Sequence, residues 1–281
     1  MHYIKGINFF LKIDRPLIMG ILNVTPDSFS DGGKYLKPEA AVRQVRQMAA
    51  EGADIIDIGG ESTRPYARPV SLKEELKRVV PIIRAVRKKV KNIISVDTYK
   101  SEVAAAALEE GADIINDISA LRMDACMGEV AARYGAPVVL MHMQGSPGNM
   151  QKNPRYRNVV SDVVRFLKKS ISTAQSYGIK KDRIVLDPGI GFGKSVEHNL
   201  QIIKNLEKLS VLGCPLLVGP SRKSFIGKIL DTEVDQRVEG TAAAVAISVW
   251  NGADIVRVHD VREMKRVADM TWRIRQSVIR R

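Results

Sequence analysis

The chain has 281 residues, of which 45% are hydrophobic, and it carries a formal net charge of +13 at pH 7. A chain of this length suits one large domain, and α/β barrels are commonly single domains of this size. It has no apolar run long enough to span a bilayer and no signal-peptide pattern at its start, so we expect neither a membrane partner nor secretion. The two cysteines, Cys126 and Cys214, lie far apart without metal-type spacing, which predicts reduced thiols and a cytoplasmic location.

The positive charge is compatible with nucleic-acid binding, with attraction of small anionic substrates, and with a solvated basic surface. Much of it lies on the run Arg84–Lys89 and at the end of the chain, from Arg273 to Arg281. Aromatic residues make up 5% of the chain, and none alternates with these basic runs as a platform for stacking bases would require. We therefore favour a solvated surface and expect no nucleic-acid partner.

The first sixteen residues precede the first predicted barrel strand. We expect Ile7 to Arg15 to form a small hairpin that plugs the N-terminal mouth of a barrel. A single domain, residues 1–281, would then consist of this plug (1–16) and the barrel (17–281). No linker or shift in composition marks a second domain.

One sequence motif occurs three times, at Glu51–Asp57, Glu110–Asn116 and Asn251–Arg257. Each copy has glycine, alanine and aspartate followed by β-branched residues. This pattern is typical of a helix that ends at a glycine, a tight turn, and a strand. The repeat is therefore one helix-to-strand step.

Eight short apolar runs are predicted to be parallel strands covered on both sides. They are Leu17–Leu22, Ile55–Ile58, Ile93–Val96, Ile114–Asn116, Val138–Met141, Ile184–Leu186, Leu216–Val218 and Ile255–Val258. Helical patterns lie between them, so we predict an α/β fold, a (β/α)8 TIM barrel. A doubly wound sheet is the alternative, but it usually has fewer strands.

For three predicted helices the sequence also predicts how they begin or how they pack. Ser71–Glu74 is a capping box that begins a helix, and Pro81 within that helix should kink or split it. Asp260 and Glu263 begin the last helix in a similar way. The run Gly240–Trp250 is apolar almost all round, so we expect both of its faces to be buried, with a neighbouring subunit as one candidate partner.

Polar residues follow every predicted strand, at the end where a barrel of this kind places its site. After the strands in order stand Asn23; Asp57 and Gly59–Pro65; Asp97–Thr98; Asn116–Asp117; Met141–Gly145; Asp187–Lys194; Gly219–Lys223; and Arg257–Asp260. Helix caps and turns explain any one of these, but not all eight together. We therefore predict a polar site at this rim.

The residue types indicate the ligand. Asp57, Asp97, Asn116 and Asp187 offer acceptors to a flat heterocycle with several N–H donors, and Lys223 is suited to a ring carbonyl or ring nitrogen. The chain also offers donors to an anion. They are Arg64, Arg257 and His259, with arginine best in a bidentate fork. The pocket therefore suits a polar heterocycle joined to a phosphate-like group.

With these residues in place, the chain resembles the bacterial dihydropteroate synthases from about Leu17 to Glu263. The resemblance rests on seven motifs that occur in order. They are Asn23–Gly33, Gly59–Pro65, Ser95–Thr98, Met141–Gly145, Asp187–Lys194, Ser221–Lys223 and Arg257–Asp260. It implies a TIM-barrel enzyme of folate synthesis, usually a homodimer. Such an enzyme condenses 7,8-dihydropterin-6-ylmethyl diphosphate with 4-aminobenzoate and releases diphosphate, with Mg²⁺ assisting.

The resemblance also implies roles for single residues. The pterin is expected on Asp57, Asp97, Asn116, Met141, Asp187 and Lys223. The diphosphate is expected on Asn23, Thr63, Arg64, Arg257 and His259, with Asn23 holding Mg²⁺. The aminobenzoate, and sulfonamides that mimic it, are expected on Phe29, Thr63, Pro65, Phe192, Ser221 and Lys223. The residues expected to act in catalysis are Asp97, Asp187, Lys223 and Arg257.

One departure and two alternatives remain. Tyr66 stands where the family commonly has glycine, and this bulkier side chain is expected to stiffen or re-aim that loop. We expect Pro26–Gly33 to close with Thr63–Tyr66 after an SN1-like loss of diphosphate. The alternatives are a pterin-binding methyltransferase-type barrel, which should lack the Asn23–Gly33 stretch, and a non-catalytic basic paralogue that binds RNA.

Overall fold

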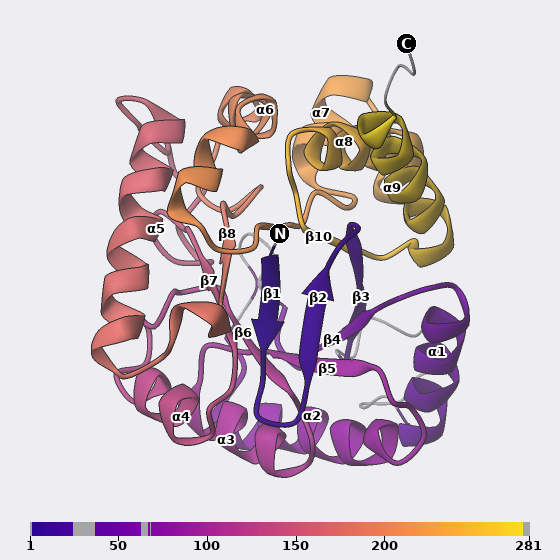
Figure 1. Ribbon diagram of the computed structural model, residues 1–281, viewed down its shortest axis with the longest axis vertical. Helices are drawn as coiled ribbons and strands as arrows, with labels where there is room; N and C mark the ends of the chain where they lie inside the picture. The colour runs from indigo at the N-terminus through magenta and orange to yellow at the C-terminus, as the bar shows by residue number, and fades with distance from the viewer. Residues whose placement is uncertain (1, 25–36, 63–66, 68, 278–281) are drawn as a thin grey trace.

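The computed structural model describes residues 2–24, 37–62, 67 and 69–277 of the chain. Its centre is a parallel sheet of eight strands in the order β8-β7-β6-β5-β4-β3-β10-β9. A bridge between Leu186 and Leu216 joins the two edges of this sheet and closes it into a ring. The predicted (β/α)8 TIM barrel is therefore confirmed, and Figure 1 shows its helices arranged around the outside of the strands.

The strands agree closely with the predicted apolar runs. They are β3 (Leu17–Asn23), β4 (Ile55–Gly59), β5 (Ile93–Asp97), β6 (Ile114–Asp117), β7 (Val138–Met141), β8 (Ile184–Asp187), β9 (Leu217–Val218) and β10 (Ile255–Val258). Nearly every residue in them is buried, as expected of strands with a helix layer outside and side chains inside.

The helices fill the intervals between strands. They are α1 (Pro38–Ala50), α2 (Leu72–Arg87), α3 (Ser101–Glu109), α4 (Met127–Arg133), α5 (Val159–Ser176), α6 (Val196–Lys204), α7 (Ser224–Leu230), α8 (Val238–Trp250) and α9 (Val261–Gln276). Short 3₁₀ helices occur at Lys181–Arg183, Leu206–Leu212 and Val234–Gln236.

Helix α2 confirms its predicted N-cap and shows that Pro81 does not split it. The Ser71 hydroxyl accepts from the Glu74 backbone N–H at 3.3 Å, so the N-cap is formed as expected. Pro81 does not split the helix, which continues to Arg87. A proline removes only one helical hydrogen bond, and the face that includes Val79 and Ile83 remains buried on both sides of it. Packing of that face outweighs the local cost.

The aspartate in each copy of the repeated motif has a structural role. Asp54 accepts from the backbone N–H of Ile18, Asp113 from Ile94 and Asp254 from Leu216, all at 2.8–2.9 Å. In each case the acceptor precedes one strand and the donor lies at or next to the start of its neighbour in the sheet. A basic side chain, Arg15, Arg87 or His2 respectively, pairs with the same carboxylate. The repeat therefore fixes neighbouring strands in register.

The N-terminal hairpin consists of β1 (His2–Lys5) and β2 (Phe10–Ile13), paired antiparallel. It starts earlier than predicted, because Gly6 and Phe9 form the turn. Its buried side chains, Ile4 and Ile13, pack with the first residues of the barrel strands, such as Leu17 and Ile55. The hairpin lies across the N-terminal mouth of the barrel, as predicted (Figure 1).

Helix α8 does not bury both faces within this chain. Thr241, Val245 and Val249 are buried, whereas Ile247 and Trp250 are each 49% exposed. The single chain buries one face of α8, and burial of the other face against a neighbouring subunit stays a prediction. The face that carries Ile247 and Trp250 is apolar and faces outward.

Candidate active site

The strand ends bring the predicted acceptors together at the C-terminal rim. Asp57, Asp97, Asn116 and Asp187 come from four strands and are all buried. The register places Asp97 beside Asn116 and Asp187 beside Met141. Parallel strands present their carboxyl ends at one edge, so residues 130 positions apart in the chain lie at one rim.

Arg257 links these acceptors. Its Nε donates to Asp57 Oδ2 at 2.6 Å, and its Nη2 donates to Asp97 Oδ2 at 2.7 Å. Asn116 donates its side-chain N–H to the same Asp57 oxygen at 3.0 Å. The other oxygen, Asp57 Oδ1, is buried and has no hydrogen-bond partner in the described part of the chain. The guanidinium, predicted to bind an anion, thus binds two carboxylates with two of its five N–H donors.

Burial raises the pKa values of Asp97 and Asp187 toward neutral pH. Burial raises the pKa of Asp97 to about 7, although the Arg257 charge opposes this rise. Burial also raises the pKa of Asp187 to about 6, opposed by the hydrogen bond from the Gly189 N–H and by Lys223. These carboxylates are therefore desolvated acceptors that gain from a ligand's N–H donors.

Lys223 lies over the aromatic side chain predicted to meet aminobenzoate. Its Nζ is 4.2 Å from the centre of the Phe192 ring. Gly191 makes this approach possible, because its φ is +82° and a Cβ there would lie 3.0 Å from Lys223 Cδ. Phe192 and Met141 belong to an apolar cluster at the rim. The remaining members of that cluster are Ile118, Met143, Met150 and, at its edge, Tyr99.

Ser221 and His259 form a second polar pair at the rim, from the ends of β9 and β10. Ser221 Oγ lies 3.0 Å from His259 Nδ1 and accepts from the His259 backbone N–H at 3.2 Å. Burial, together with the charges of Arg257 and Arg222, lowers the pKa of His259 to about 3. The imidazole is therefore neutral. In the tautomer in which Nδ1 accepts from the serine hydroxyl, its Nε2–H is a donor suited to an anion.

Asn23 ends β3 beside Gly59 of β4, at the same rim. Among the residues that the structure describes, no group of three His, Cys, Asp or Glu side chains could hold a metal ion by itself. A Mg²⁺ ion commonly takes one or two protein oxygens and completes its shell with phosphate and water. The single amide oxygen of Asn23 fits an ion of that kind, which would arrive with a phosphorylated ligand.

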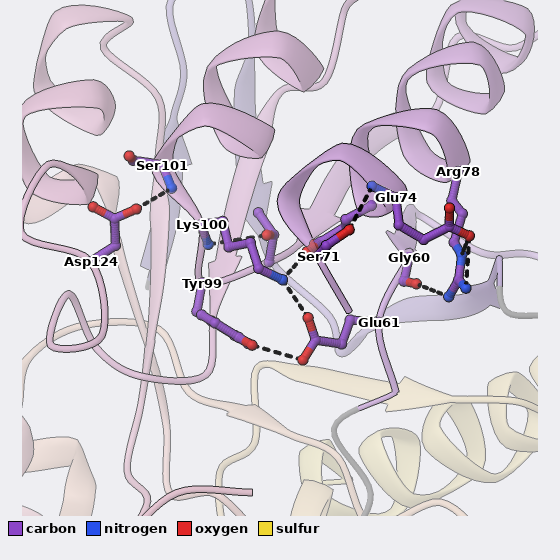
Figure 2. A network of polar contacts seen from close by, with 11 residues as sticks. Gly60, Glu61, Ser71, Glu74, Arg78, Tyr99, Lys100, Ser101 and Asp124 are labelled. Carbon is purple, nitrogen blue, oxygen red and sulfur yellow. Dashed lines mark hydrogen bonds and ion pairs between the residues drawn. The ribbon is translucent and has the colours of Figure 1, made fainter. Parts of the chain in front are cut away.

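A partly buried polar network joins the segments that follow β4 and β5 to helix α2 (Figure 2). Lys100 pairs with Glu61 and, at 2.5 Å, with Glu75, while the Tyr99 hydroxyl donates to Glu61 at 2.7 Å. Arg78 donates to the Gly60 carbonyl at 2.9 Å. The network fixes the segment that leaves β4, up to Glu61.

Several predicted residues lie outside the described residues. They are Phe29, Thr63, Arg64 and Pro65, together with Tyr66 and the Pro26–Gly33 stretch. Their roles, and the expected closure of the two loops, stay predictions.

The sequence reading missed residues that support the site from behind. Glu61, Tyr99 and the pair His142 and Lys194 stand inside or next to the predicted motifs, yet they were given no role. Lys194 Nζ lies 2.9 Å from His142 Nδ1, and both side chains are buried. Their position in the motifs was the available signal, but spacing alone does not reveal a contact between residues 52 apart.

Comparisons with known proteins agree on one family. A family model described as "Pterin binding enzyme" matches residues 19–259. A dihydropteroate synthase from Haemophilus influenzae is 52% identical over 254 residues, which is 90% of this chain and 92% of that protein. A Yersinia pestis dihydropteroate synthase, solved with a sulfonamide drug complex, superposes with a TM-score of 0.93 at 44% identity, over 98% of this chain and 100% of that one. The Xanthomonas albilineans enzyme with 4-aminobenzoic acid gives 0.91 at 45% identity, over 98% of each chain.

Proposed function

The chain belongs to the dihydropteroate synthase family of pterin-binding enzymes. From the residues of its site we propose how it catalyses the reaction of that family. It is a transferase that condenses 7,8-dihydropterin-6-ylmethyl diphosphate with 4-aminobenzoate, giving 7,8-dihydropteroate and diphosphate. The observation that carries the proposal is the set of buried acceptors, Asp57, Asp97, Asn116 and Asp187, around the Arg257 fork.

The acceptors suit the aminopyrimidinone edge of a pterin. That edge is flat and presents several N–H donors, as the guanidinium of Arg257 does to Asp57 and Asp97. Hydrogen bonds to ionised carboxylates contribute about 1.5–3 kcal/mol each. A ring that lacks one donor leaves a buried acceptor unpaired, so the pocket selects pterins. Met141 provides an apolar surface, and Lys223 a donor for a ring carbonyl or nitrogen.

The leaving diphosphate is proposed to lie toward Arg257, His259 and Asn23. Arg257 has three N–H donors beyond those used on Asp57 and Asp97, and neutral His259 can donate its Nε2–H. Mg²⁺, bound by Asn23 and the phosphate oxygens, would supply positive charge that stabilises the departing diphosphate. Donors fixed in a water-poor site favour the charge that develops as the C–O bond breaks.

The bond changes follow an SN1-like order. The C–O bond to diphosphate breaks with its electron pair on oxygen, and the pterin ring delocalises the resulting methylene cation. The arylamine nitrogen then forms the C–N bond and loses a proton to solvent. No strong base is required, because this nitrogen is already nucleophilic. Ser221, Phe192 and Lys223 are proposed to hold the aminobenzoate, which a sulfonamide would displace.

We also propose a cytoplasmic homodimer. The half-exposed Ile247 and Trp250 on α8 offer an apolar face to a second copy. In the part of the chain that the structure describes, no helix is long and apolar enough to cross a membrane. Both cysteines are free, which agrees with a reducing compartment.

A coupled assay for diphosphate release tests the proposed function. We expect release only when both substrates are present, inhibition by a sulfonamide that 4-aminobenzoate relieves, and large losses in Asp97→Asn and Lys223→Ala. Independent binding of aminobenzoate and sulfonamide would contradict the shared site. Absence of turnover combined with tight, salt-sensitive RNA binding would favour the non-catalytic alternative instead.

A further inference from the structure

Lys194 is a buried lysine that the reaction described above does not use. Its side chain is 3% exposed, and its ammonium donates to three acceptors from two segments. These are His142 Nδ1 at 2.9 Å, the Phe192 carbonyl at 3.0 Å and the His142 carbonyl at 3.3 Å. Buried lysines are ordinarily paired with a carboxylate, and none of these acceptors is one. Because burying an ammonium costs free energy, its place here calls for a reason.

His142 is built to receive this ammonium. Burial lowers the pKa of Lys194 to about 7. In its protonated form Nζ only donates, so Nδ1 then accepts and the ring proton lies on Nε2. Burial, together with the charges of Lys194 and Arg122, lowers the pKa of His142 to about 2. The ring also lies 4.8 Å from the centre of the Phe166 ring, edge to face. The imidazole is therefore a fixed neutral acceptor.

The other end of the contact is the segment Gly189–Gly193. Gly191 and Gly193, on either side of Phe192, have φ values of +82° and +62°, so this backbone has a conformation that other residues rarely adopt. The backbone carbonyls of Gly191, Phe192 and Gly193 each accept a hydrogen bond from a side chain. Gln151 donates to the first and Tyr156 to the third, each at 2.6 Å, and Lys194 donates to that of Phe192 itself. These contacts fix the direction of the Phe192 ring.

The same contacts reach Asp187. The His142 N–H donates to the Asp187 carbonyl at 2.9 Å, and the Gly189 N–H donates to Asp187 Oδ1 at 2.6 Å. The charge of Lys194 also attracts the Asp187 carboxylate from the buried side. One ammonium therefore lies behind both a proposed pterin acceptor and a proposed aminobenzoate wall.

We propose that Lys194 is a positioning residue that fixes the Gly189–Gly193 segment against His142, and thereby orients Phe192 toward aminobenzoate and Asp187 toward the pterin. The inference rests on the proposed function, through the roles given to Phe192 and Asp187. Without the ammonium, the Phe192 carbonyl loses its donor and His142 Nδ1 loses its partner. The aminobenzoate side should respond most, since Phe192 is bonded to Lys194 directly.

Lys194→Met tests the proposal, with Lys169→Met on the exposed face of α5 as the matched control. Misplacement of a binding group by about 1 Å can cost factors near 10². We expect the KM for 4-aminobenzoate and the inhibition constant of a sulfonamide to rise in parallel by about tenfold or more. The dissociation constant of 6-hydroxymethylpterin should rise less, and kcat least. Lys169→Met should match the wild type.

Each outcome decides the question. A folded Lys194→Met enzyme with a lower Tm but KM and inhibition constants within twofold of wild type would show a merely structural role and overturn the proposal. If the methionine variant does not fold, Lys194→Gln replaces it, because its polar side chain is easier to accommodate but is shorter and uncharged, so it cannot reach all three acceptors of the ammonium. Unchanged constants in that variant would overturn the proposal equally. Failure of the wild type to release diphosphate would instead count against the proposed function.

Discussion

At the residue scale, the pocket keeps two desolvated carboxylates ready for a ligand. Asp97 shares Arg257 with Asp57, whereas Asp187 has the Gly189 N–H as its hydrogen-bond donor. A site arranged for its own stability would not bury these acceptors with so few partners. Their raised pKa values are the cost of being complementary to a pterin, and they make binding depend on pH.

Pterin binding should strengthen as pH rises through the pKa values of the two carboxyls. A protonated carboxyl cannot accept at its protonated oxygen, and the pKa of Asp97 is about 7 while that of Asp187 is about 6. The dissociation constant of 6-hydroxymethylpterin, measured by titration calorimetry, should therefore fall as pH increases from 5 to 8. In Asp97→Asn the step near pH 7 should disappear and the step near pH 6 should remain. A dissociation constant that is flat across this range in the wild type would refute the assignment.

Stability of the ligand-free protein should change with pH in the opposite sense. Burial raises the pKa of Asp187 from its ordinary 3.8 to about 6, so the folded state holds this proton more tightly than the unfolded chain. The stabilisation is complete below about 3.8 and is lost as pH rises through about 6, a difference of about 3 kcal/mol. Asp187→Asn should lack this part of the pH dependence. Urea denaturation of both proteins at pH 5 and pH 8 should show about 1.4 kcal/mol of this difference, since part of it is already lost at pH 5. An equal change in the free energy of unfolding between the two pH values in both proteins would contradict the assignment.

At the element scale, the helix-to-strand step that occurs three times fixes strand register through its aspartate. Asp113 accepts from the Ile94 N–H at 2.8 Å and pairs with Arg87 of α2. It therefore joins β5, the start of β6 and α2 at one point. Such a carboxylate, on the N-terminal side of the barrel, belongs to stability and not to catalysis.

Asp113→Ala should lower the free energy of unfolding by about 2–3 kcal/mol, because a backbone N–H and a guanidinium lose a charged acceptor. The kcat/KM of the folded enzyme should stay unchanged. Glu110→Ala is the matched control, since Glu110 also pairs with an α2 arginine, Arg84, but at the surface, where ion pairs contribute little. Guanidinium denaturation of both variants gives the comparison. Equal effects would show that register is not held at Asp113.

At the scale of the whole molecule, the strand-end loops are braced to one another in sequence around the rim. The Ser101 N–H donates to Asp124, Arg122 to the Met143 carbonyl, and Lys194 to the His142 carbonyl, so the loops after β5, β6, β7 and β8 are connected. Arg222 and Asp260 join those after β9 and β10. The rigid part of the site is therefore a set of linked loops and not eight independent ends.

The sequence predicted the strands well because buried parallel strands are continuous apolar runs, and a polar residue after each run locates the rim. It predicted Asp57, Asp97, Asn116 and Asp187 for the same reason. It could not predict that Arg257 binds Asp57 and Asp97, since those contacts span 200 and 160 positions. Of its two expectations for Pro81, the split does not occur, because tertiary packing outweighed a local preference. Pairwise side-chain contacts need the fold before they can be inferred.

The outward face of α8 leads to the last prediction, which concerns assembly. Ile247 and Trp250 on α8 are half exposed, as are Ile229 and Leu230 on α7, which packs against α8 at Gly240. Figure 1 shows the two helices side by side at one edge of the barrel. Full burial of one large apolar side chain contributes about 1.5–3 kcal/mol, so a face of this composition is better covered than solvated. A second copy would present the same face by two-fold symmetry.

Analytical ultracentrifugation at micromolar concentration should therefore give the wild type twice the chain mass of 31.1 kDa. Ile247→Glu should shift it toward a single chain, because a carboxylate from each copy would be buried in an apolar interface. Phe10→Glu is the control, since Phe10 is 63% exposed on the hairpin at the N-terminal mouth. It should leave the mass of the assembly unchanged. A wild type that sediments as one chain would remove the basis for the dimer, and an Ile247→Glu protein that stays dimeric would place the interface elsewhere.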